Sequence, residues 1–290
     1  NVKVAGFSFI RDAIKYDYPI VEAIRSILPL CDEFVVAVGK SGDDTLELIR
    51  KIDSPKIRII ETVWDDSLRN GGVVLAKETD KAFNAISEDV DWAFYIQGDE
   101  VLHEKYYDTV TQAMLRWKDD PDVDGLLFRY THFYGSYDYV GSAPRWYRNE
   151  IRIIRRNKNI YSYRDAQGFR KDDNKKLNVK PVDAFIYHYG WVKHPCSMQQ
   201  KINNFTRLYR SDTEMNIADD NEFDYSNIDI LSRFDGTHPK VMEERIKRIN
   251  WKFDHDISKT NLSLKFAFKM LVEKLTGYRI FEYKNYKIRK

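Results

Sequence analysis

The stretch Asp91–Glu104, DWAFYIQGDEVLHE, sets an apolar run directly against two adjacent carboxylates. The segment Trp92–Ile96 is apolar without interruption, as expected of a strand that is buried on both faces of a sheet. Residues 97–100, QGDE, follow it at once. Ligands of open α/β sheets bind outside the carboxyl ends of the strands. The stretch therefore predicts a central strand with a ligand site at its end.

Strand-like and helix-like segments alternate through the first 130 residues. Short apolar runs predict strands at Val2–Phe9, Glu33–Val38, Lys56–Glu61, Trp92–Gln97 and Leu126–Tyr130. The segments between them predict helices at Tyr18–Leu28, Thr45–Ile52, Gly71–Ile86 and Glu104–Trp117. This alternation predicts an α/β fold with a mainly parallel sheet that is flanked by helices.

The remaining residues are less regular. Residues 131–195 hold short β-like runs, and residues 196–211, 240–254 and 261–276 read as helices. Residues 212–239 are acidic and read as a loop. We therefore expect a domain over residues 1–195 and a mostly helical C-terminal extension over residues 196–290.

Composition narrows the class of protein. The net charge of +2 is the sum of a net negative charge on residues 1–150 and a net positive charge on residues 151–290. The basic half is available to an anionic partner, or the two halves neutralise each other. No nucleic-acid-binding module and no apolar run of about 18 residues is present, so neither nucleic acid nor a membrane span is expected. Cys31 and Cys196 form no disulfide framework, which favours a reducing, cytoplasmic compartment.

Four segments, in order, resemble the family 2 glycosyltransferases, which have the GT-A fold. The segments are VKVAGFSFIRD, EFVVAVGKSGDDT, NGGVVLAKETDKAF and DWAFYIQGDEVLHE. Within them, VGKSGDDT resembles the family's D-D-G-S-x-D-G-T, and YIQGDE resembles its D-x-D region. The resemblance covers about residues 2–195. It implies a GT-A-like catalytic domain with a nucleotide-binding half, residues 1–130, and an acceptor side, residues 131–195.

The resemblance also implies an activity. The chain is expected to move a sugar from a nucleotide-sugar donor to a saccharide or lipid-linked glycan acceptor, with inversion, in cell-surface polysaccharide or lipopolysaccharide synthesis. Val38 and Gln97 stand where the family has acids. The alternative is therefore a non-catalytic nucleotide-sugar-binding protein on the same fold.

Nine residues are expected to bind the donor, because they lie in the family's motifs, at the expected strand ends or just before the helix predicted at Gly71–Ile86. They are Phe9, Arg11, Ser41, Asp43, Arg69, Gly72, Gln97, Gly98 and Asp99. Simpler roles stay open for some of them: Asp43 also suits a helix N-cap, and Arg69 a surface turn.

A divalent cation, Mn²⁺ or Mg²⁺, is implied by the D-x-D resemblance. Asp99 would be its main ligand, with His188 or Glu100 as helpers. A buried core histidine is the alternative for His188. Gln97 replaces the first acid, and an amide supplies no charge to a metal. A metal-independent enzyme is therefore the other interpretation.

Asp165, in the segment YSYRDAQGFR, is the candidate general base. The attacking hydroxyl of an acceptor must lose its proton, and the family places an acid in this region. The alternative is a loop carboxylate paired with Arg164 or Arg170. Asp183 and Asp138 are the next acids to consider.

The C-terminal segment Leu262–Lys290 interleaves apolar residues with lysine and arginine. This pattern suits a peripheral contact with anionic lipid at the inner face of the membrane. The alternative is a helix that docks on the catalytic domain with a solvated basic face.

Overall fold

The computed structural model describes residues 1–68, 71–156, 159–209, 222–280 and 282–289. Its strands are β1 (Val4–Ile10), β2 (Glu33–Gly39), β3 (Ile57–Thr62), β4 (Trp92–Tyr95), β5 (Glu100–Leu102), β6 (Gly125–Tyr134), β7 (Ser136–Gly141), β8 (Asn149–Arg155), β9 (Ile160–Tyr163), β10 (Gly168–Lys171), β11 (Lys175–Trp191), β12 (Leu231–Arg233) and β13 (Tyr286–Ile288). Its α-helices are α1 (Ile20–Ile27), α2 (Thr45–Arg50), α3 (Val73–Ala85), α4 (Tyr107–Trp117), α5 (Pro195–Tyr209), α6 (Glu243–Lys247) and α7 (Leu264–Thr276). Short 3₁₀ turns precede α4 and α6, at Glu104–Tyr106 and Lys240–Met242.

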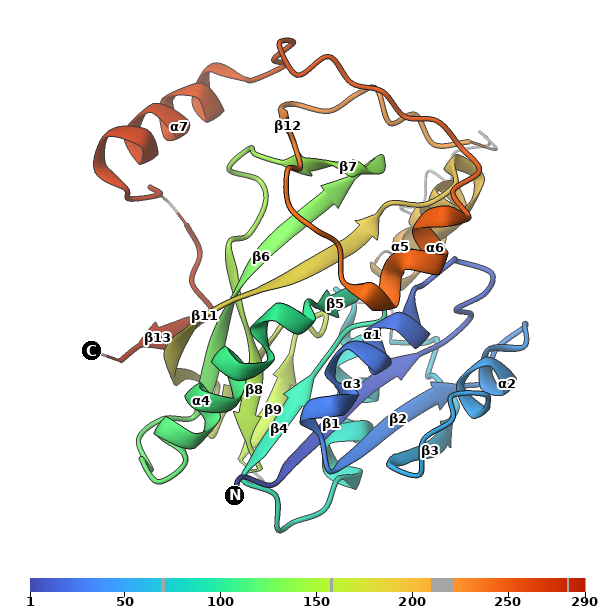
Figure 1. Cartoon of the computed structure of the whole chain (residues 1–290), viewed down its shortest axis with the longest axis vertical. Coiled ribbons are helices and arrows are strands. Elements are labelled where there is room, and N and C mark those ends of the chain that lie inside the picture. Colours follow the sequence, from blue (N-terminus) through green and yellow to red (C-terminus); the bar gives the residue numbers. More distant parts are fainter. Residues whose placement is uncertain (69–70, 157–158, 210–221, 281, 290) are drawn as a thin grey trace.

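A single curled sheet runs through the molecule in the order β3-β2-β1-β4-β8-β6-β11-β10-β9 (Figure 1). The first four strands are parallel to one another. β8 is antiparallel to both of its neighbours, β4 and β6, and β11 is again parallel to β6. The carboxyl ends of β1, β2 and β4 therefore meet at one edge, as the sequence predicts.

The sheet is buried on both faces, which is why its central strands are apolar throughout. On one face, Phe94 of β4 lies in a cluster with Ile24 of α1 and Met114 of α4. On the other, Phe7 of β1 packs against Phe83 of α3, with ring centroids 5.2 Å apart. Because successive side chains of a strand point to opposite faces, these strands contribute to a core on each face of the sheet. The two cores together fix the position at which β4 ends.

The C-terminal part returns to the sheet after leaving it. β13 pairs in parallel with β11, with Leu177 opposite Tyr286. Helix α7 has no buried residue and lies at the outer edge of the molecule (Figure 1). The described residues contain no helix that is long and apolar enough to cross a membrane.

The predicted α/β architecture with flanking helices is confirmed. The helix predicted over residues 240–254 is shorter in the structure, where α6 ends at Lys247. The strands β5, β10, β12 and β13 were not expected from the sequence. Each has three or four residues and is held by partners far along the chain or by a tight hairpin. The predicted loop 212–239 lies in part outside the described residues.

Candidate functional site

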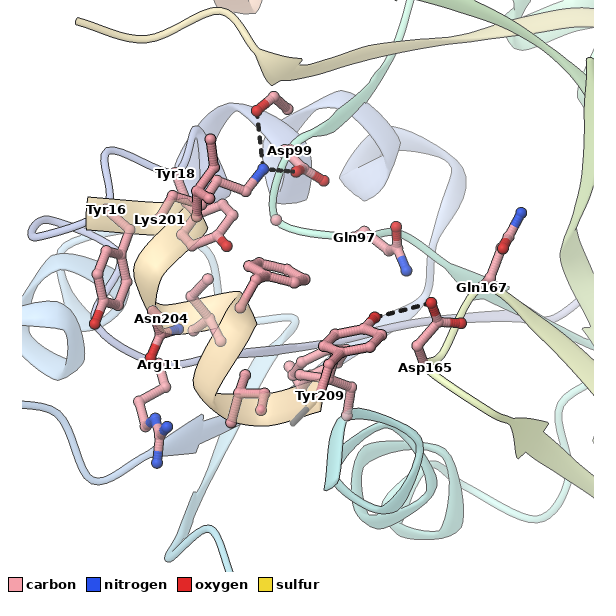
Figure 2. Close-up of a pocket in the computed structure, with 18 of the residues that line it drawn as sticks. Arg11, Tyr16, Tyr18, Gln97, Asp99, Asp165, Gln167, Lys201, Asn204 and Tyr209 are labelled. Atoms are coloured by element: carbon pink, nitrogen blue, oxygen red, sulfur yellow. Dashed lines mark hydrogen bonds and ion pairs between the residues drawn. The ribbon is translucent and has the colours of Figure 1, made fainter. Parts of the chain in front are cut away.

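A cleft with a volume of about 740 Å³ opens at the carboxyl ends of β1 and β4. Helix α5 lies along its other side (Figure 2). The cleft is lined by seven residues that the sequence singled out: Phe9, Arg11, Gln97, Gly98, Asp99, Asp165 and His188. The acids at the end of β4 and in the loop before β10 therefore face the same cavity, although they are far apart in sequence.

Asp99 is nearly buried, with 8% of its surface exposed, and it has a cationic partner. The Lys201 ammonium of α5 lies 3.1 Å from Asp99 Oδ2 and donates a second hydrogen bond, of 2.8 Å, to the Gly190 carbonyl (Figure 2). Burial acts to raise the pKa of Asp99, but the nearby cations, Lys201 above all, hold it well below its usual range. Asp99 is thus ionised and neutralised by Lys201.

His188, on β11, lies beside Asp99 with its Nε2 atom 3.7 Å from Oδ1. Burial lowers the pKa of His188 to about 4, against the opposing effect of Asp99. The imidazole is therefore neutral at pH 7, and the charge that Asp99 feels comes from lysine. Its other nitrogen, Nδ1, is 3.3 Å from Nδ1 of His132, another buried and neutral histidine.

Glu100 is not free to help at this site, which corrects its expected role. Its carboxylate is fully buried and receives two hydrogen bonds from Arg152, of 2.8 and 2.7 Å, and one of 2.8 Å from the Tyr130 hydroxyl. Gln97 is likewise directed away from Asp99, because its amide donates to the Ala166 carbonyl at 3.0 Å. Among the described residues that line this end of the cleft, Asp99 alone presents a carboxylate.

Asp165 lies at the opposite end of the cleft. The Tyr209 hydroxyl, at the end of α5, donates a hydrogen bond of 2.8 Å to Asp165 Oδ2 (Figure 2). The flanking residues Arg164 and Ala166 have positive φ angles of 56° and 65°. This tight loop turns the Asp165 side chain toward α5 and away from either expected arginine partner.

A second cavity, of about 330 Å³, adjoins the first at Asp165. Tyr147, Asp165 and Gln167 line both cavities. The second cavity also holds the aromatic rings of Trp146, Tyr163, Tyr283 and Tyr286, together with several basic side chains. Neither Asp183 nor Asp138 lines either cavity, and Asp183 instead pairs with Arg129 at the surface.

Glu150 forms part of the wall of the second cavity and has an unusual environment. One of its oxygens accepts a hydrogen bond of 2.8 Å from Gln167, while Oε2 has no hydrogen-bond partner. Burial raises the pKa of Glu150 to about 8. Asn285 also has a buried oxygen without a partner. These two groups offer hydrogen bonds to a ligand hydroxyl or amide.

The loop after β1 forms the remaining part of the first cleft. The Arg11 guanidinium lies over the Trp64 ring, 4.1 Å from its centroid, and donates a hydrogen bond of 2.9 Å to Asp66. The Phe9 ring is tilted by 50° to the Trp64 ring, with ring centroids 5.8 Å apart. Phe9, Arg11 and Trp64 all line the cleft, and they form a surface against which a nucleobase can stack.

Three of the predicted donor residues, Ser41, Asp43 and Gly72, do not line the cleft. Ser41 Oγ accepts from the Asp12 amide at 2.9 Å, and Asp43 accepts from the Lys15 amide at 2.8 Å, so both join neighbouring loops. Asp43 also accepts from the Thr45 amide at 3.0 Å, at the start of α2. Donor binding by these two residues stays a prediction.

Gly72 lies close to the Asp165 side chain. Its φ of +74° favours glycine, and a Cβ atom there would lie 2.9 Å from the Cβ of Asp165. Arg69 lies outside the described residues, and donor binding by Arg69 stays a prediction.

The described residues contain no group of three or more histidine, cysteine, aspartate or glutamate side chains that could hold a metal ion. The predicted ligands Asp99 and His188 do lie together, but they are only two, and the charge of Asp99 is already matched by Lys201. This donor set does not fit a resident metal, and we derive no step through one.

No protein-family model and no curated protein matches the chain. Among solved structures, the chain is similar to a crystal structure of S. aureus TarS 1-349 in complex with UDP, at 19% identity and a TM-score of 0.35, over 46% of this chain and 37% of that one. It is also similar to the mannosyltransferase PcManGT from Pyrobaculum calidifontis in complex with GDP-Man and Mn²⁺, at 19% identity and a TM-score of 0.32, over 43% of this chain and 34% of the other.

A third similarity is to glucosyl-3-phosphoglycerate synthase from Mycobacterium tuberculosis, in complex with Mn²⁺, UDP and phosphoglyceric acid. The identity is 20% and the TM-score 0.30, over 46% of this chain and 44% of that one. These neighbours are GT-A-like nucleotide-sugar transferases, the class that the sequence resembles. The matches span less than half of each neighbour, and at these TM-scores they carry no argument about activity, which must come from the site.

Several groups in the site were not expected from the sequence. Lys201 and Tyr209 come from a segment that reads only as a helix, yet they contact the two acids of interest. Their spacing of eight residues, a little over two turns, was a usable signal that they share one side of α5. No comparable pattern pointed to Glu150 or Gln167.

Proposed function

We propose that this chain is a glycosyltransferase that moves a sugar from a nucleotide-sugar to a glycan acceptor. One observation carries the proposal: Asp165 lies in the wall of two adjoining cavities, one large enough for a nucleotide-sugar and one smaller. A transferase needs two substrates to meet at a group that can accept a proton. The position of Asp165 supplies that arrangement.

The donor is assigned to the larger cleft. The base stacks on the Phe9, Arg11 and Trp64 surface, and the diphosphate extends toward the end of β4. Gly98 lies at that end and allows a close approach of the backbone. The acceptor is assigned to the second cavity, where Tyr163 and Tyr283 offer faces for a sugar ring and Glu150 offers a polar contact.

In the proposed reaction, Asp165 accepts the proton of an acceptor hydroxyl as that oxygen attacks C1 of the donor sugar. The bond between C1 and the diphosphate oxygen breaks, and the nucleoside diphosphate leaves with the electron pair. Attack from the side opposite the leaving group inverts the configuration at C1. Tyr209, which donates to Asp165 in the ligand-free protein, gives up that bond when the acceptor hydroxyl takes its place.

The acceptor is proposed to be a saccharide or lipid-linked glycan, in cell-surface polysaccharide synthesis, and helix α7 gives the lipid-linked form its support. Four exposed apolar residues repeat at helical spacing along one side of α7: Leu264, Phe268, Leu271 and Leu275. Lys265 and Lys274 are exposed and flank this stripe on its two sides, at the 100° per residue of an α-helix.

Glu273 lies on the opposite side of α7 and pairs with Arg148 and Arg279. The helix is therefore anchored on the side that carries Glu273, and it presents the stripe of leucine and phenylalanine outward. An exposed apolar stripe between cations suits an anionic lipid surface.

The test is the release of nucleoside diphosphate from a panel of nucleotide-sugars, with and without simple saccharide acceptors. A glycosyltransferase releases diphosphate slowly with water and faster with an acceptor, and Asp165→Asn lowers both rates. Binding of a nucleotide-sugar with no release under any condition would instead identify a non-catalytic binding protein.

A further inference from the structure

The position of a cation at the end of β4 is already taken by a side chain. Asp99 is the only carboxylate that the described part of the cleft presents there, because Glu100 is bound to Arg152 and Gln97 is an amide. Lys201 lies 3.1 Å from Asp99 and also lines the cleft. Its ammonium group therefore supplies a positive charge beside the one carboxylate that would serve as a metal ligand here.

Lys201 is held in a built position. Two of its three protons go to Asp99 and to the Gly190 carbonyl, so one is left for a ligand oxygen. The rings of Tyr18 and Phe205 lie on its flanks, 5.2 and 5.6 Å from Nζ. Only 12% of the Lys201 side chain is exposed, so ligand binding costs little further loss of rotamer freedom.

The backbone is shaped around the same group of side chains. A Cβ atom on Gly190 would lie 2.7 Å from Asp99 Oδ2 and 2.6 Å from His188 Cε1. A side chain at this position would therefore displace the Asp99 carboxylate or the His188 imidazole from its place beside Lys201. Such a close approach of the backbone is what a site with fixed donors requires.

Charge balance favours an ammonium group over a metal ion here. Asp99 contributes one negative charge, Lys201 one positive charge, and buried Lys193 adds a fraction of another, since burial lowers its pKa to about 7. A divalent ion would meet these cations with one carboxylate and a neutral His188 as ligands. Two ionised phosphates of a donor would instead meet a site that is already neutral to positive.

We propose that Lys201 supplies the positive charge that balances the donor diphosphate and the departing nucleoside diphosphate, in place of a divalent metal ion. This inference rests on the proposed function, since it concerns the same donor site. Asp99 is then a positioning residue: it holds the ammonium group in place, and it does not ligate a metal.

Calorimetry of ADP, CDP, GDP, TDP and UDP binding to the whole chain in excess EDTA provides the test. At least one of these should bind in EDTA, and excess Mg²⁺ or Mn²⁺ should not strengthen that binding. Lys201→Met should weaken that diphosphate about 10- to 100-fold, the range of a charge-assisted hydrogen bond. The affinity for the matching nucleoside, which lacks phosphate, should not change. Lys201→Arg should recover most of the lost affinity.

Two further variants separate the inference from a general loss of charge or of folding. Lys175→Met removes an equal charge from an exposed lysine outside both cavities, and it should bind the diphosphate like the parent chain. Asp99→Asn keeps an oxygen that can accept from Lys201 and removes the carboxylate charge, so diphosphate binding in EDTA should persist, whereas binding through a metal ligated by Asp99 would be lost. Thermal unfolding of each variant checks that it is folded.

The outcomes are distinct. If the diphosphate binds only with Mn²⁺ or Mg²⁺, and Asp99→Asn abolishes that binding, the inference is overturned while the proposed function stands. If Lys201→Met lowers the affinity for nucleoside and diphosphate equally, Lys201 merely supports α5 and the inference is again wrong. If none of the five diphosphates binds under any condition, the proposed function fails and the inference with it.

Discussion

The Tyr209 hydroxyl donates a hydrogen bond to Asp165 at 2.8 Å, which joins the end of helix α5 to the loop where the two cavities meet. Burial raises the pKa of Tyr209 far above its usual value, and the negative charge of Asp165 adds to this effect. Tyr209 is therefore a donor at any working pH. The same helix holds Asp99 through Lys201, so α5 contacts both candidate acids before any ligand is present.

Asp165→Asn is expected to lower turnover about 10²- to 10⁴-fold, because the amide keeps the size of the side chain but cannot take the acceptor proton. The affinity for nucleoside diphosphate should stay nearly unchanged, since the diphosphate end of the cleft is not altered. Steady-state rates and calorimetry measure the two effects. Asp183→Asn is the matched control: its side chain is 81% exposed and lies outside both cavities, and normal turnover is expected. Equal losses in the two variants would remove Asp165 from its proposed role.

Glu100→Gln is expected to destabilise the protein by about 3–5 kcal/mol, as typical when one partner of a buried ion pair is lost. Both Glu100 and Arg152 are fully buried, so the substitution leaves an uncompensated guanidinium in the core. Urea unfolding at pH 7 measures the change. Glu61→Gln removes the partner of Arg50 in a pair that is half exposed, and it should change the free energy of unfolding little. A small effect of Glu100→Gln would mean that Arg152 reaches water or another acceptor.

The site could be predicted from the sequence where it depends on local pattern. The end of β4 was recognisable because an apolar run stops at QGDE, and strand ends carry ligands in such sheets. The roles of the two adjacent acids could not be predicted, because they depend on partners that are distant in sequence. Glu100 pairs with Arg152, whereas Asp99 pairs with Lys201. One residue of offset along a strand end turns a side chain from the cleft into the core.

The second cavity depends even more on distant residues. It is formed by residues 144–150, by the loop at Asp165 and by the C-terminal residues 279, 280, 282, 283, 285 and 286, which β13 brings back to the sheet. A three-residue strand has no periodicity to read, and its register is set by β11 alone. The basic tail therefore gave a signal of charge but none of its place beside the second cavity.

Glu150→Gln is expected to change how stability depends on pH. The pKa of Glu150 is raised to about 8 in the folded protein, from an ordinary value of 4.5 in the unfolded chain. Between these values the folded state holds the extra proton, so its contribution to stability is complete below pH 4.5 and is lost as pH rises through 8. A glutamine cannot ionise and escapes that loss.

The free energy of unfolding of Glu150→Gln minus that of the parent should therefore rise from pH 6.5 to pH 8.5. Burial lowers the pKa of His132 and His188 to about 3 and 4, so they add a slope of opposite sign where the unfolded chain titrates, near pH 6.5, but equally in both proteins. Lys193 contributes a slope of opposite sign, but equally in both proteins, and it cancels in the difference. A difference that does not vary with pH would show that Glu150 is ionised in the folded state.

Helix α7 is expected to bind anionic lipid through its exposed stripe. Leu264 and Leu275, at its ends, are 91% and 75% exposed, and nothing in the described part of the chain covers the side between them. Sedimentation with vesicles of phosphatidylglycerol and phosphatidylcholine should recover the chain, whereas pure phosphatidylcholine should recover little of it. Rising salt should weaken the binding, because the contribution of lysine is screened.

The double variant Phe268→Ser and Leu271→Ser should lower the vesicle partition coefficient by at least about 10-fold, since burying each such side chain is worth about 1.5–3 kcal/mol. Its folding should be unaffected, because neither side chain is buried in the free protein. Val63→Ser removes an apolar side chain that is 73% exposed on another part of the surface, and it should bind vesicles like the parent. If the double variant binds equally well, or if neutral vesicles bind the parent as strongly as anionic ones, α7 is not a lipid-binding element. The stripe would then have to be covered by protein, which size-exclusion chromatography of the parent and the double variant would reveal as a difference in oligomeric state.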